Sequence, residues 1–169
     1  MELSGKHAIV CGSSQGIGLS TAKLMAERGA KITLVGRNEI KMIAAMRSLK
    51  QIDGIEHDFF IADFSQPNQL KEAIANYLSK GNQPTILVNN TGGPKGGLII
   101  DADISEFTAT FNQHLVCNHI MVQALFPVMK SQGEGSIINV ISTSVKQPLN
   151  GLGVSNTIRG AVANWSKTM

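Results

Sequence analysis

Three glycines stand between an apolar run and a helical pattern near the start of the chain, with the spacing Gly-x3-Gly-x-Gly. Glycines allow a tight turn and a close backbone approach to a ligand. The amino terminus of the helix that follows supplies free N–H groups and a partial positive charge, which suits a pyrophosphate. The alternative is a purely structural turn between a strand and a helix. We expect a phosphate-binding loop whose contacts come from Gly12, Ser14, Gln15, Gly16, Ile17 and Gly18.

Other chemistry-bearing residues follow the later apolar runs, at the points where strands would end. The carboxyl ends of parallel strands meet at one edge of a sheet, and ligands bind along that edge. The residues at these points are Arg37, Asp63, Asn90, Thr91, Gly92 and Ser142.

The elements that must position these residues are short apolar runs alternating with longer helical segments. We expect helices at 17–28 and 39–50, one that Ser65 caps with Pro67 in its first turn, a long one at 104–130, and a last one from about Ser155. Strands that are apolar on both sides imply a parallel sheet covered on both faces. The fold class is thus α/β, a doubly wound parallel sheet in a single domain over residues 1–169. The expected strands are 7–11, 32–35, 59–62, 85–88 and 136–141.

Composition excludes several classes of protein. With 43% hydrophobic and 16% charged residues among 169, the chain is not intrinsically disordered. The net charge is +3, but the 15 Lys and Arg are scattered, so no nucleic-acid partner is expected. No stretch approaches 18 apolar residues, so no membrane span is expected. Cys11 and Cys117 lack metal-ligand spacing, which predicts no metal site and a reducing, cytoplasmic compartment.

Taken together, the glycine loop, Asp63, the Asn89-Asn90-Thr91-Gly92 segment and Ser142 resemble the short-chain dehydrogenase/reductase family, in particular its 3-oxoacyl carrier-protein reductase branch. The resemblance runs from Lys6 to Met169. It implies an oxidoreductase with a Rossmann-like NAD(P)-binding domain. The glycine loop would bind the pyrophosphate, Asp63 would lie by the adenine, and Asn90, Thr91 and Gly92 would line the floor beneath the nicotinamide. Asp63 and Asn90 can equally be turn residues after a strand.

Arg37 bears on the choice of cofactor. The second strand ends in Gly36-Arg37-Asn38, with no acid placed to accept hydrogen bonds from a free ribose 2′-hydroxyl. An arginine at this point can pair with a 2′-phosphate. We expect NADP rather than NAD; the alternative for Arg37 is a solvated surface residue.

The catalytic positions implied by the resemblance depart from the family pattern. That pattern is an Asn, Ser, Tyr and Lys tetrad, in which the Tyr transfers the proton while the Lys lowers its pKa and holds the ribose. Ser142 matches the serine, but Ser155 stands in the Tyr position, Arg159 in the Lys position and His114 in the Asn position. Arg159 keeps a positive charge for a developing alkoxide, and His114 is a candidate proton source. The alternatives are a packed helix histidine at 114, and helix capping with a solvated or ribose-facing guanidinium at 155 and 159.

Two functions follow. The first is an NADP-dependent oxidoreductase that transfers hydride between nicotinamide and a small-molecule carbonyl or secondary alcohol. The second is a catalytically degenerate nucleotide-binding or assembly protein on the same fold. The low charged fraction and the long helix predict a homodimer or homotetramer, in which Phe107, Phe111, Leu115, Val122 and Met129 serve an interface or the core. The family sheet has two further strands, so we expect the native chain to continue past Met169.

Overall fold

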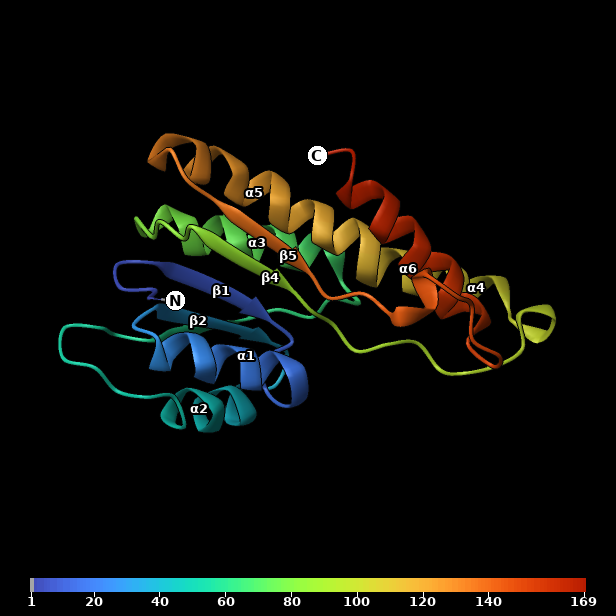
Figure 1. Cartoon of the computed structure of the whole chain (residues 1–169), viewed down its shortest axis with the longest axis horizontal. Helices are drawn as coiled ribbons and strands as arrows, with labels where there is room; N and C mark the ends of the chain where they lie inside the picture. The colour runs from blue at the N-terminus through green and yellow to red at the C-terminus, as the bar shows by residue number, and fades with distance from the viewer. Residues whose placement is uncertain (1) are drawn as a thin grey trace.

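The computed structural model describes residues 2–169 and contains one five-stranded, fully parallel sheet (Figure 1). The strand order is β3-β2-β1-β4-β5, so the direction of winding reverses between β1 and β4. This confirms the doubly wound parallel sheet expected from the apolar runs. In such a sheet the crevice at the carboxyl ends of the strands, beside the reversal, is the place where ligands bind. The strands are β1 (His7–Cys11), β2 (Lys31–Gly36), β3 (Asp58–Ile61), β4 (Ile86–Asn89) and β5 (Ser136–Asn139).

Helices cover both faces of the sheet (Figure 1). On one face lie α1 (Gly16–Glu27) and α2 (Glu39–Arg47), and on the other lie α3 (Pro67–Ser79) and α5 (Cys117–Gln132), with α6 (Gly153–Ser166) beside α5. Right-handed connections between parallel strands require this arrangement. The remaining elements are α4 (Ile104–Phe111), the π-helical turn η2 (Asn112–Val116) and the 3₁₀ turns η1 (Ile99–Asp101) and η3 (Thr143–Val145).

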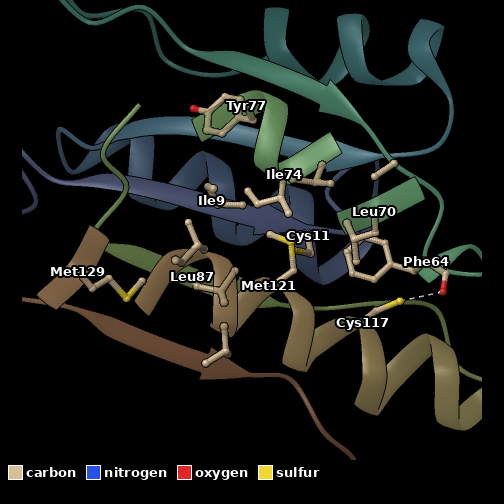
Figure 2. Packing of buried hydrophobic residues seen from close by; sticks show 14 residues of the cluster. Ile9, Cys11, Phe64, Leu70, Ile74, Tyr77, Leu87, Cys117, Met121 and Met129 are labelled. Carbon is tan, nitrogen blue, oxygen red and sulfur yellow. Dashed lines mark hydrogen bonds between the residues drawn. The ribbon is translucent and has the colours of Figure 1, made fainter. Parts of the chain in front are cut away.

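The core consists of two apolar layers, one on each face of the sheet. Alternate residues of a strand point to opposite faces, so Ile9 and Cys11 pack under α3 and α5 while Ala8 and Val10 pack under α1 and α2. Figure 2 shows the first layer, in which the Cys117 thiol donates a hydrogen bond to the Phe64 carbonyl oxygen at 3.2 Å. Both cysteines are buried and free. Cys11 is the last residue of β1, so the apolar layer reaches the strand end next to the glycine loop.

Several details differ from the expected elements, and the helix expected at 39–50 ends at Arg47. The stretch 104–130 is helical, but the π-helical turn η2 separates α4 from α5. The sequence did not predict this turn, because a single wider turn leaves the repeat of apolar residues intact. Ser65 is not the helix cap. Gln66 holds that position without a capping side chain, and the Ser65 N–H instead donates to Asp63 Oδ1 at 2.8 Å. The fifth strand ends at Asn139, short of the expected 141.

The candidate interface residues on the long helix divide between the core and the surface. Val122 and Met129 are buried in the core, whereas Phe111 keeps 41% of its surface exposed. Among the residues that the structure describes, β5 pairs with β4 on one side and with no strand on the other. Ile138 in β5 and Ile141 after it are exposed. Within residues 2–169, no helix combines the length and the apolar character needed to cross a membrane.

Candidate cofactor site

The glycine loop makes its turn in very little space. Gly12 has a φ of +58°, and a Cβ at this residue would lie 2.4 Å from the Asn90 carbonyl oxygen. A Cβ at Gly18 would lie 2.4 Å from the Gly12 carbonyl oxygen. Only glycine fits at these two positions. The loop therefore lies directly against the end of β4 and delivers the chain into the first turn of α1.

The amino terminus of α1 is open to a ligand. Gln15 is the N-cap residue, and its side chain makes no capping hydrogen bond. The first N–H groups of a helix have no partner within the helix, so those of α1 are available to an anion. The backbone here thus provides donors and partial positive charge without any charged side chain.

A cavity of about 560 Å³ lies over this helix end and along the carboxyl ends of β1 to β4. Ten of the eleven residues predicted to bind a cofactor line it, and Gly18 is buried beneath the loop instead. The sheet order places the β2 and β3 ends on one side of the glycine loop and the β4 end on the other. The lining residues are Gly12, Ser14, Gln15, Gly16, Ile17, Gly36, Arg37, Ala62, Asp63, Phe64, Asn90, Thr91, Gly92, Gly93 and Gln113.

Two polar side chains fix the walls of this cavity. The Asn90 amide nitrogen donates to the carbonyl oxygens of Cys11 and Gly12, both at 3.2 Å, and so joins the β4 end to the glycine loop. The buried Ser13 hydroxyl accepts a hydrogen bond from the Val35 N–H at 3.1 Å, which joins the loop to β2. Asn90 thus lines the cavity and also holds the loop.

The side of the cavity at β2 and β3 carries one basic and one acidic residue. Arg37 follows β2 directly, is exposed and lines the cavity. Asp63 lines it too, while its Oδ1 accepts the Ser65 N–H and begins the turn into α3. Asp63 therefore begins the turn after the strand, as one of the two expectations has it, and also lines the cavity.

The opposite side of the cavity is tied to the π-helical turn η2. Thr91 Oγ1 and His114 Nδ1 lie 2.6 Å apart, and the Gln113 amide nitrogen donates to the Gly92 carbonyl oxygen at 2.9 Å. His114 is 1% exposed, and its Nε2 has no partner among the residues that the structure describes. Burial lowers the pKa of His114 to about 4, and the positive charge of Arg159 acts in the same direction. The ring is therefore neutral at pH 7.

The Arg159 guanidinium lies between the ends of β4 and β5. Its Nη1 donates to the Val140 carbonyl oxygen at 2.8 Å, and its Nη2 lies 3.8 Å from the position of a Cβ built on Gly93. The Nε is buried and has no partner within residues 2–169. Burial lowers the pKa of this group, but an arginine remains charged at any working pH. An unneutralised cation at this position favours oxygen-rich or anionic ligands.

The two candidate serines are less closely joined to the cavity. Ser142 Oγ accepts the Ser144 N–H at 3.1 Å and begins η3, and Ser155 lies half-buried in the first turn of α6. Neither serine lines the cavity. Within the described part of the chain, no hydrogen bond joins any two of Ser142, Ser155, Arg159 and His114. The structure thus places the predicted cofactor residues in one cavity. The four predicted catalytic residues share no such hydrogen bond, although Arg159 lies close enough to His114 for its charge to lower the pKa of the ring.

Sequence comparison now identifies the family. The family model described as short chain dehydrogenase matches residues 6–169. The chain belongs to this family. Among curated short-chain dehydrogenase relatives, the 3-oxoacyl-(acyl-carrier-protein) reductase FabG of Chlamydia trachomatis is 32% identical, over 83% of this chain and 56% of its own length. The inactive hydroxysteroid dehydrogenase-like protein 1 of Homo sapiens is 27% identical, over 98% of this chain and 50% of its own. The chain spans about half the length of these curated relatives.

Solved short-chain dehydrogenase structures share the fold. The L-sorbose reductase of Gluconobacter frateurii, in complex with NADPH and L-sorbose, superposes with a TM-score of 0.92 at 32% identity. The match covers 99% of this chain and 64% of the reductase. The five-stranded sheet described above is therefore a short-chain dehydrogenase sheet.

Several residues of the site were absent from the prediction. Gly36, Ala62, Phe64, Gly93 and Gln113 all line the cavity. Each of the five is adjacent in the chain to a predicted site residue, so widening each motif by one residue would have included them. What the sequence does not show is the contact of Gln113 with Gly92, because it joins segments 21 residues apart.

Proposed function

We propose that this chain is the nucleotide-binding domain, over residues 1–169, of an NADP-dependent oxidoreductase that moves hydride between nicotinamide and a carbonyl or secondary alcohol. The observation that carries the proposal is the cavity over the open amino terminus of α1, lined by the predicted cofactor residues. The packing of Gly12 and Gly18 against backbone carbonyl oxygens fixes the loop, and Gly16, where a Cβ would meet no other described atom within 4 Å, leaves room for a ligand to approach the backbone.

The preference for NADP rests on Arg37. The residue follows β2 at the cavity wall, where a guanidinium can form a bidentate pair with a 2′-phosphate. The other charged residue in the wall is Asp63, which comes from β3 and is already engaged by the Ser65 N–H. Bound NADPH would supply the hydride to a carbonyl, and bound NADP⁺ would accept it from an alcohol.

The residues at the four tetrad positions would have to stabilise the charge that develops on the substrate oxygen and transfer its proton. Arg159 provides a fixed positive charge near Gly93, suited to an oxyanion that develops on the substrate. Burial keeps the His114 ring neutral at pH 7 and makes it a weak base, so it is a poor proton source and fits the positioning of a neighbour better. Ser142 and Ser155 remain the hydroxyl groups of the proposed site.

The alternative is a protein that keeps nucleotide binding and has lost the reaction. The observation that favours it is the absence of a tyrosine from the family position, since a serine hydroxyl is a far weaker acid than a phenol. A general acid contributes about 10²- to 10⁴-fold in rate. One relative, from Homo sapiens, is named an inactive hydroxysteroid dehydrogenase-like protein, so a protein named as inactive exists among the relatives of this chain. A homodimer or homotetramer is proposed for either function.

The first experiment is a calorimetric titration of the purified protein with NADPH and, separately, with NADH. We expect NADPH to bind more tightly, and Arg37→Asp to abolish that difference because it removes the partner of the 2′-phosphate. Arg47→Asp makes the same change of charge at the end of α2, away from this cavity, and serves as the control. An unchanged ratio of affinities in Arg37→Asp would show that this residue does not select the cofactor.

Measuring NADPH oxidation distinguishes the oxidoreductase from the non-catalytic nucleotide-binding protein. A panel of carbonyl compounds with NADPH should show nucleotide oxidation that falls in Ser142→Ala. Nucleotide binding without any oxidation above background would favour the non-catalytic alternative.

A further inference from the structure

Thr91 and His114 come from distant parts of the chain and meet at the cavity wall. Thr91 belongs to the loop after β4, and His114 is the third residue of η2. Their side chains approach to 2.6 Å between Oγ1 and Nδ1, one of the shortest contacts between side chains in the structure. His114 stands where the family pattern described above has an asparagine, so the contact joins a departure from that pattern to the cavity wall.

The hydrogen bond between Thr91 and His114 uses only part of the hydrogen-bonding capacity of the Thr91 hydroxyl. A neutral imidazole has one donor and one acceptor nitrogen, and a hydroxyl has one hydrogen and two lone pairs. When His114 Nδ1 carries the hydrogen it donates to Thr91, and the hydroxyl hydrogen is free. When Thr91 donates to the ring, a lone pair of its oxygen is free. Because Thr91 lines the cavity and His114 is buried behind it, the free hydrogen or lone pair is available to the cavity.

The neighbouring residue strengthens this connection. Gln113 donates to the Gly92 carbonyl oxygen, so two consecutive residues of η2 hold two consecutive residues of the loop. π-helical turns occur frequently at functional sites. The orientation of the Thr91 hydroxyl is consequently set by the helix as well as by its own loop.

We propose that Thr91 is a ligand-contacting residue whose hydroxyl is held in place by His114, and that the pair determines how tightly the cavity binds the nicotinamide half of the dinucleotide. The inference rests on the proposed function. The sheet order supports the choice of half, because β4, which carries Thr91, lies on the opposite side of β1 from β2, which carries Arg37. A ligand that lacks the nicotinamide half would reach Arg37 and the glycine loop without reaching Thr91.

The test compares NADPH with adenosine 2′,5′-bisphosphate, which has the 2′-phosphate and no nicotinamide. One hydrogen bond contributes enough for about a three- to tenfold change in affinity. We expect Thr91→Val to weaken NADPH by about that factor and to leave the bisphosphate unchanged. Thr91→Ser keeps the hydroxyl and should restore most of the affinity. Arg37→Asp should weaken both ligands, which shows that the bisphosphate measurement is sensitive.

The role of His114 is tested by His114→Leu and by the double variant. If the two residues act as one unit, His114→Leu weakens NADPH as Thr91→Val does, and the double variant loses no more than either single variant. Thr110→Val, which removes a buried hydroxyl from the adjoining helix α4, is the matched control and should bind both ligands as the wild type does. Thermal melts show which variants fold. If His114→Leu does not fold, the Thr91→Val and Thr91→Ser pair still decides the proposal.

Three results would overturn the inference while the proposed function stands: NADPH binding unchanged in Thr91→Val, equal losses for both ligands, or losses that multiply in the double variant. A wild-type protein that melts cooperatively and binds neither NADPH nor NADH would overturn both proposals together.

Discussion

Gly18 shows how much of the site depends on a missing side chain. A Cβ at this position would lie 2.4 Å from the Gly12 carbonyl oxygen and 2.8 Å from the Asn90 amide nitrogen. The first of these atoms is backbone, and the second already bonds the loop. The loop therefore cannot make room without giving up the contacts that shape the cavity.

We predict that Gly18→Ala lowers the free energy of unfolding by about 1–3 kcal/mol, as overpacking at a tight contact does. Urea denaturation measures the change. Gly160→Ala is the control, because Gly160 lies in α6 with no atom within 4 Å of the added Cβ. That variant should gain about 0.5–1 kcal/mol from the better helix propensity of alanine. Equal shifts in the two variants would contradict the steric argument.

For single residues, the sequence predicts contacts between neighbours in the chain and misses contacts between residues that are far apart in the chain. The glycine loop was predictable because its three glycines lie within seven residues of one strand-to-helix turn. The Thr91–His114 contact was not predictable, because it spans 23 residues and depends on the position of η2. His114 was a candidate through the resemblance alone, which gives a position but no partner.

Helix α3 is joined to the sheet by a polar network of side chains within an apolar layer. The Tyr77 hydroxyl lies 2.6 Å from Thr33 Oγ1 on β2 and 3.2 Å from His7 Nε2 on β1. All three residues are buried, and burial raises the pKa of Tyr77. The network lies toward the amino ends of the strands, away from the cavity, so this tyrosine serves the fold.

We predict that Tyr77→Phe costs about 0.5–1.5 kcal/mol of stability, the usual contribution of one hydrogen bond. The cost stays moderate because His7 and Thr33 keep each other as partners at 2.7 Å. Chemical denaturation provides the measurement. Ser79→Ala, an exposed position near the end of the same helix, should leave stability within about 0.5 kcal/mol of the wild type. A Tyr77→Phe protein as stable as the wild type would show that the hydroxyl contributes nothing.

Elements were predicted better than their ends. The five strands and the helices between them follow from apolar runs and helical periodicity, which persist over many residues. Their boundaries depend on single contacts, such as the Asp63 oxygen that engages the Ser65 N–H and leaves Gln66 as the cap of α3. The apolar repeat of Phe107 and Phe111 runs into the π-helical turn, so it predicted one uninterrupted helix.

The whole molecule should lose stability in mild acid. Burial lowers the pKa of both His7 and His114 to about 4, with Lys31 and Arg159 respectively adding to the effect. Between about pH 6.5 and pH 4 the unfolded chain therefore binds more protons than the folded one, so the free energy of unfolding falls as the pH falls. Asp58 acts in the opposite sense, because burial raises its pKa.

We predict that the urea midpoint drops between pH 7 and pH 4.5, and that His7→Gln and His114→Asn each make this drop smaller. Urea titrations at the two pH values measure it. His119→Gln changes an exposed histidine outside both networks and is the control. A drop of the same size in all four proteins would assign the acid sensitivity to other groups.

The hydrogen bonds of Asn90 and Ser13 also determine when conformational entropy is lost. They hold the glycine loop between β4 and β2 through contacts that belong to the folded protein itself. The loop therefore loses its conformational entropy when the chain folds, and ligand binding does not have to order it. A nucleotide that enters the cavity meets backbone donors already in position, so each bond it forms there counts almost fully toward affinity.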